Sequence, residues 1–119
     1  MSDEQGYNGW KNYETWSVAL IVDNDERTYS QRQNIVRLAL MEARADDQPE
    51  SWTPDEHRRY RVADAIKDWV EWAAEIEHDV AESQPFSFLW SQLISAALSE
   101  VDWDELARHW IDDAIEAEA

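Results

Sequence analysis

The scarcity of glycine and proline constrains the fold of this chain more than any other feature. Its 119 residues include two glycines, Gly6 and Gly9, and three prolines. Tight turns between β-strands depend on glycine and on asparagine or aspartate beside it. The chain beyond Asn12 therefore lacks the turn chemistry of a β-protein. Helices are the expected structure, and the length predicts a single domain.

Helix-start signals and hydrophobic periodicity divide the chain into about five helices. The clearest start is Thr53, a capping hydroxyl followed by Pro54 and by Glu56 three residues on. Asp102 and Glu105 repeat this capping pattern. We predict an all-α fold, a compact bundle of about five helices. Residues 1–12 form an N-terminal arm, residues 13–119 form one helical domain, and helices are expected at 13–22, 26–44 and 54–82, after Pro85 and after Asp102.

Apolar side chains at helical spacing identify the expected core. The helix after Pro85 is the most hydrophobic, and we expect its apolar stripe to be buried, as in the helix before it. The helix at 26–44 is apolar on two sides, so it lies centrally or meets a second copy through Ile35, Leu38 and Met41. The two core stripes are Val62, Ile66, Trp69, Val70, Ala73, Ile76 and Val80, and Phe86, Leu89, Trp90, Leu93, Ile94, Ala97, Leu98 and Val101.

Acidic residues dominate the charge, and they outnumber bases most strongly in the second half of the chain. The formal net charge is −17. Residues 1–67 hold 13 acidic and 9 basic residues, whereas residues 68–119 hold 14 acidic residues and one base, Arg108. A surface of this sign repels a phosphate backbone, which argues against direct nucleic acid binding. The 44% hydrophobic content and eight tryptophans exclude a disordered acidic tail.

Six carboxylates of the third expected helix lie on one line opposite its core stripe. On a helical wheel they fall within about 40° of that line, and they span about 27 Å. Like charges at these spacings destabilise a helix by about 0.2–0.5 kcal/mol per pair. Trp72 lies on the flank, where an exposed indole is an anchor for a partner. This acidic ridge consists of Asp64, Asp68, Glu71, Glu75, Asp79 and Glu82, and the last helix carries Glu105, Asp112, Asp113 and Glu116 on its outward side.

Adaptation to a salt-rich cytoplasm is the strongest alternative explanation of the acidity. Two lysines against eight arginines fit such a chain, because a Debye length of about 3 Å at 1 M salt removes the repulsion. Adaptation to solvent acidifies all exposed surface, however, whereas here most of the net charge follows Lys67. The asymmetry favours an acidic binding face.

The sequence offers little chemistry for catalysis. The absence of cysteine removes thiolate nucleophiles and Cys-ligated metals. Glu75 and His78 form one Glu-x-x-His pair, whereas di-iron bundles need two such pairs and two further glutamates. A histidine among acidic residues, such as His109, is more often a surface side chain than a ligand. We expect no enzyme, no metal and no cofactor, and a metal-dependent enzyme at these histidines is the weakest interpretation.

No segment of the sequence has the character of a membrane span or a leader. The longest apolar run, residues 18–22, is far too short for a span. The N-terminus carries Asp3 and Glu4 rather than a basic segment followed by an apolar one. We therefore expect a protein of the host cytoplasm without membrane contact.

The N-terminal segment, Gly6 to Trp16 with Asn12-Tyr13-Glu14-Thr15-Trp16 at its end, carries a family resemblance. It resembles small proteins of phages, archaeal viruses and plasmids that share an Asn-Tyr-Glu-Thr-Trp start. The likeness extends through Asp25 and departs at Ile21 and Val22, where members of the group often have Trp and Leu. The group implies no active site.

In size, acidity, helical content and its ending rich in Trp, Asp and Glu, the rest of the chain resembles DNA-mimic anti-restriction and anti-CRISPR proteins. This resemblance implies a non-catalytic inhibitor of a basic DNA- or RNA-binding host protein, such as a restriction or CRISPR effector. The acidic ridge, Trp72 and the outward acids of the last helix are then the partner-binding residues. The alternative is a small structural or regulatory protein of a halophilic virus or plasmid, with apolar helix faces as its contacts and a homodimer as one arrangement.

Overall fold

Five helices form the structure, a computed structural model that describes residues 6–45, 51–80 and 86–118. The all-α prediction of about five helices is confirmed. Residues 46–50, residues 81–85 and the termini lie outside the description, and with them the expected end of the third helix and the start at Pro85. The helices are α1 (Tyr13–Asn24), α2 (Glu26–Ala45), α3 (Pro54–Val80), α4 (Ser87–Ser99) and α5 (Trp103–Glu118).

Short-range hydrogen bonds fix the starts of the helices. At α3 the Thr53 backbone N–H donates to Glu56 Oε1 at 2.8 Å, and the Glu56 N–H donates to Thr53 Oγ1 at 3.1 Å. This is the reciprocal capping box that the sequence predicts. At α1 the side chain of Asn12 accepts from the Thr15 N–H at 2.9 Å. Asp25 separates α1 from α2 and accepts the Arg27 N–H at 2.9 Å.

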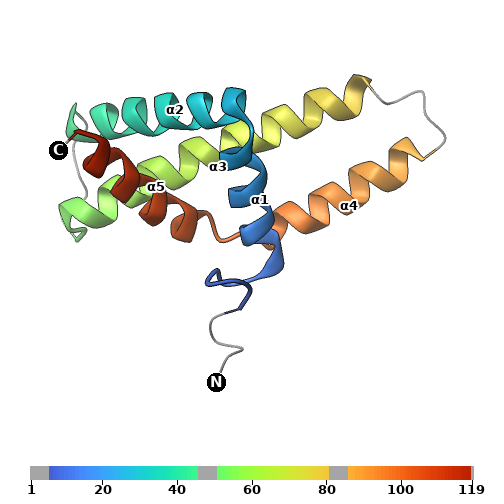
Figure 1. The fold of residues 1–119 in the computed structure, drawn as a ribbon, viewed down its shortest axis with the longest axis horizontal. Coiled ribbons are helices and arrows are strands. Elements are labelled where there is room, and N and C mark those ends of the chain that lie inside the picture. The colour runs from blue at the N-terminus through green and yellow to red at the C-terminus, as the bar shows by residue number, and fades with distance from the viewer. Residues whose placement is uncertain (1–5, 46–50, 81–85, 119) are drawn as a thin grey trace.

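The buried core lies between α1, α2, α5 and the N-terminal half of α3. Helix α2 runs beside α3, and α5 packs against both (Figure 1). Trp110 of α5 is the largest fully buried side chain. The core consists of Ala19, Val22, Val36, Ala39, Leu40, Val62, Ile66, Val101, Leu106, Ala107, Trp110 and Ile111.

The C-terminal half of α3 and most of α4 extend away from this core, on the right of Figure 1. The radius of gyration is accordingly 15.7 Å, against about 13.5 Å for a compact chain of this length. The prediction that the apolar stripe of α4 is buried was wrong for its N-terminal half. Helix α4 packs mainly on α3. The large side chains exposed there are Phe86, Leu89, Trp90 and Leu93.

Candidate functional site: the acidic face of helix α3

Helix α3 is continuous over 27 residues, so the acidic ridge follows one straight element as far as it is described. Asp64, Asp68 and Glu75 are exposed. Within the described ranges none of these three carboxylates forms an ion pair. A row of exposed and unneutralised carboxylates on a helix sets up a negative potential along that face.

Glu71 differs from its neighbours because it is half-buried and paired. Its Oε2 lies 3.2 Å from the Nζ atom of Lys67, one turn earlier on α3. Glu71 and Glu75 also line a groove of about 740 Å³ between α3 and α4. The ridge therefore turns part of its charge toward α4, and Lys67 neutralises one of the groups there.

Trp72 lies next to the ridge with 62% of its surface exposed. It shares an open hollow of about 480 Å³ with Asp68, Trp69, Glu71 and Glu75. Arginine stacks on indole faces and forms paired hydrogen bonds with carboxylates. An exposed indole surrounded by carboxylates is therefore suited to an arginine side chain of a partner.

The structure places the remaining predicted residues in different situations. Asp79 belongs to α3, but its side chain and the whole of Glu82 lie outside the described part. Asp112 and Glu116 are exposed on α5. Asp113 is exposed as well, but its Oδ2 lies 3.3 Å from Arg32 Nη1 and is neutralised there.

The prediction that Glu105 faces outward was wrong. Its exposed fraction is 8%, and its Oε1 accepts the backbone N–H of Lys11 at 2.9 Å. Its own N–H donates to Asp102 Oδ1 at 3.0 Å, which is half of the predicted capping box. The side chain does not close the box because it binds the N-terminal arm, 94 residues away in the chain.

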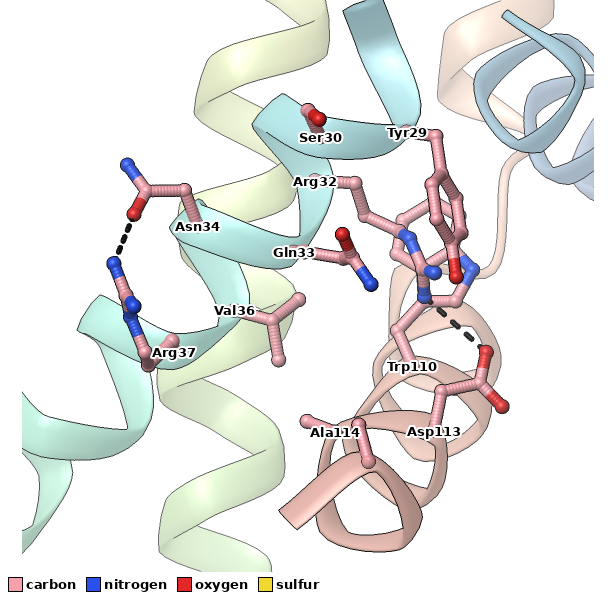
Figure 2. A pocket seen from close by; sticks show the side chains of 11 residues that line it. Tyr29, Ser30, Arg32, Gln33, Asn34, Val36, Arg37, Trp110, Asp113 and Ala114 are labelled. Carbon is pink, nitrogen blue, oxygen red and sulfur yellow. Dashed lines mark hydrogen bonds and ion pairs between the residues drawn. The ribbon is translucent and has the colours of Figure 1, made fainter. Parts of the chain in front are cut away.

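Arg32 forms a second charged cluster, which sequence reasoning missed. The side chain is 2% exposed and lines a pocket of about 350 Å³ between α2 and α5 (Figure 2). Its guanidinium carbon lies 4.7 Å from the ring centre of Tyr29 and 5.1 Å from that of Trp110. Nε lies 3.3 Å from Asp23 Oδ1. Because aromatic rings and two carboxylates already engage this cation, the pocket is a structural clamp between helices.

The Asn-Tyr-Glu-Thr-Trp segment serves as a joint in the structure. The side-chain amide of Asn12 donates to the Glu100 carbonyl at 2.7 Å, and Thr15 Oγ1 accepts the Asp102 N–H at 2.8 Å. Both bonds connect the start of α1 to the turn between α4 and α5. The segment's polar residues therefore have a structural role here.

Histidine and carboxylate side chains in the described ranges do not gather into a group of three that suits a metal ion. His109 stacks on Trp10, with ring centres 4.3 Å apart. Among the helices as described, none combines the length and apolar character that a membrane crossing requires.

Comparison with known proteins gives one match. The model of a protein family described as "Family of unknown function (DUF7249)" matches residues 3–117. The search of curated proteins and the search of solved structures give no match.

Proposed function

Since the chain belongs to DUF7249, a family of unknown function, we propose its role from its own residues: it is a non-catalytic inhibitor that binds a basic nucleic-acid-binding host protein as a nucleic acid mimic. A restriction or CRISPR effector is the expected target. The observation that supports this is the row of exposed carboxylates Asp64, Asp68 and Glu75 on one continuous helix, which pair with no base in the described part of the chain.

The spacing of the charges suits a groove that binds a polyanion. Neighbouring ridge carboxylates lie three or four residues apart, which is about 5 Å along the helix axis. One strand of a duplex carries a charge every 3.4 Å. In a cleft lined with arginine, Trp72 adds a stacking surface among the charges. Long-range attraction then makes association fast and sensitive to salt.

Among the described side chains of α3, the proposed binding face consists of Asp64, Asp68, Glu75 and Trp72, with Glu71 partly neutralised by Lys67. Asp79 and Glu82 remain predicted members of this face. Asp112 and Glu116 on α5 form a separate exposed acidic surface. Glu105 and Asp113 are left out because the fold itself uses them.

Capture from a host lysate at low salt, followed by elution in a salt gradient, tests the proposal. We expect a nucleic-acid-binding protein to elute with rising salt, and the purified chain to displace labelled duplex DNA or guide RNA from it. The triple variant Asp68→Lys, Glu71→Lys and Glu75→Lys is expected to lose both properties while its helical circular dichroism is retained.

A control variant with the same net charge distinguishes the effect of where the carboxylates lie from the effect of the total charge. The variant Glu26→Lys, Glu42→Lys and Glu100→Lys reverses three exposed acids elsewhere and is expected to keep inhibition. If the α3 variant still inhibits, or if both variants lose binding equally, the ridge is not the binding site.

Thermal melting in a series from low to molar KCl addresses the salt-adaptation alternative. We expect the fold to persist at low salt, because all of the ridge except Asp64 follows Ile66, the last residue of α3 in the buried core. A fold that collapses at low salt indicates that the acidity is an adaptation to solvent.

A further inference from the structure

Helix α4 divides its apolar stripe between α3 and solvent. Ile94 and Leu98 line the groove that faces α3, together with Ser91, Ser95 and Ser99. The apolar side chains Phe86, Leu89, Trp90 and Leu93 line a separate hollow of about 350 Å³. Phe86 is 66% exposed and Trp90 is 60% exposed. The N-terminal part of the most hydrophobic helix thus exposes its apolar side chains in one copy, as far as the described residues show.

This apolar surface continues from α4 onto α1. Ala97, one turn beyond Leu93, lines a pocket of about 300 Å³ together with Tyr13, Ile21 and other residues of α1 and α3. Tyr13 and Ile21 are themselves exposed. Aromatic side chains carry about 150–250 Å² each, so the aromatic part of this surface exposes on the order of 400 Å². The largest apolar patch of a typical monomer is about 300–600 Å² and is often functional.

The absence of charged side chains on α4 indicates which molecule binds this apolar surface. The 13 residues of α4 include no acidic or basic side chain, although the chain carries a net charge of −17. An uncharged helix offers no counterpart to the cations of a basic target. Two copies of this chain repel one another wherever their carboxylates face each other. Helix α4 is the surface at which two such chains approach without that repulsion.

We propose that this protein is a homodimer in which the apolar stripe of α4 packs against α4 of a second copy. A two-fold contact of this kind is self-complementary, since each copy contributes the same patch. With Leu89, Leu93 and Ile21 added to the aromatic side chains, the patch approaches the size of a standard interface, about 800 Å² per partner. The groove between α3 and α4, with its carboxylates, stays outside the contact, so the dimer does not depend on the proposed inhibitory function.

Sedimentation equilibrium over a wide range of concentrations, at moderate and at molar KCl, tests the proposal. Wild-type protein is expected at twice its chain mass of 14.0 kDa. The double variant Trp90→Glu and Leu93→Glu is expected to weaken dimerisation by at least about 30-fold, as for residues at the centre of an interface. Both side chains are exposed in one copy, so helical circular dichroism should change little, while the melting temperature falls only by the stabilisation that dimerisation provides.

The matched control is Leu38→Glu with Met41→Glu, which adds the same charge to the exposed side of α2. This variant is expected to remain a dimer. A wild-type protein that stays monomeric at the highest concentration refutes the proposal, as does a dimer that survives the α4 substitutions.

Cross-linking gives a readout that does not depend on charge. The chain has no cysteine, so a single Leu93→Cys or Leu38→Cys substitution places one thiol at a chosen helix. A short bismaleimide should link two copies of the first variant and leave the second as single chains. If only the Leu38→Cys variant is cross-linked, the copies meet through α2 and the proposal is wrong.

Discussion

Thr15 and Asp102, 87 residues apart in the chain, are joined by a hydrogen bond of 2.8 Å in which the Asp102 N–H donates to Thr15 Oγ1. The same hydroxyl donates to Asn12 Oδ1 at 2.6 Å. Thr15 is completely buried. The hydroxyl is therefore both donor and acceptor where α1 meets the start of α5.

Replacing Thr15 by valine keeps the shape of the side chain and removes both hydrogen bonds. The half-buried Asp102 N–H then lacks its acceptor, and we expect the free energy of unfolding to fall by about 1–3 kcal/mol. Urea denaturation followed by circular dichroism measures the change. Ser30→Ala, an exposed site on α2, should stay within about 0.5 kcal/mol of wild type. An equally small effect of Thr15→Val contradicts the role of this joint.

The two glycines of the arm provide a matched pair of alanine substitutions. Gly6 has φ +67°, and a Cβ atom there would lie 1.8 Å from the Lys11 carbonyl oxygen. Gly9 has φ +89°, and a Cβ atom there would meet nothing within 4 Å. We expect Gly9→Ala to lower the free energy of unfolding by about 1–2 kcal/mol through backbone strain alone, and Gly6→Ala to lower it further. Near-ultraviolet circular dichroism should show that Gly6→Ala also disturbs Trp10. Equal effects in the two variants would rule out the close approach at Gly6.

Lysine is not an adequate replacement for Arg32. The planar guanidinium packs against Tyr29 and Trp110 while it reaches Asp23 and Asp113, and an ammonium group cannot do both. We expect Arg32→Lys to lower the free energy of unfolding by about 1–3 kcal/mol. Arg37→Lys, one turn later and exposed, should be nearly neutral. A neutral result at Arg32 shows that its charge alone suffices.

Asp23 and Asp25 predict opposite dependences of stability on pH. Burial raises the pKa of the Asp23 carboxyl above 3.8, although Arg32 and Trp110 act against it. Its contribution to stability is thus complete below pH 3.8 and is lost as pH rises through the folded-state pKa. Hydrogen bonds from Arg27 lower the pKa of Asp25, so its contribution is present above pH 3.8 and is lost as pH falls.

Urea unfolding of wild type, Asp23→Asn and Asp25→Asn in an acidic pH series measures these contributions. The free energy of unfolding of wild type relative to Asp23→Asn should decrease as pH rises above 3.8. The same difference for Asp25→Asn should increase. If both differences in the free energy of unfolding change with pH in the same direction, burial does not dominate at Asp23 while hydrogen bonding dominates at Asp25.

Local chemistry explains which features of the fold were predictable from sequence. Thr53 and Glu56 lie three residues apart, and their capping box forms as expected. The scarcity of glycine likewise predicts helices, because turn chemistry is a property of neighbouring residues. The row of carboxylates on α3 follows from helical periodicity as soon as the helix is continuous.

Contacts between residues far apart in the chain account for the features that could not be predicted from the sequence. Glu105 has the spacing of a capping residue, but Lys11 binds its carboxylate from the other end of the chain. Trp90 has the periodicity of a core residue, but periodicity does not say which side of a helix a neighbour covers. No sequence pattern indicated the cluster around Arg32, because its two carboxylate partners lie on separate helices, α1 and α5.

The joint between Thr15 and Asp102 also orders events during synthesis. Thr15 is translated 87 residues before Asp102, its hydrogen-bonding partner. This part of the fold is therefore completed only after residue 102 and helix α5 have left the ribosome. Nascent chains stalled before that point should consequently remain sensitive to proteases at α1, which limited digestion of stalled ribosome complexes can establish.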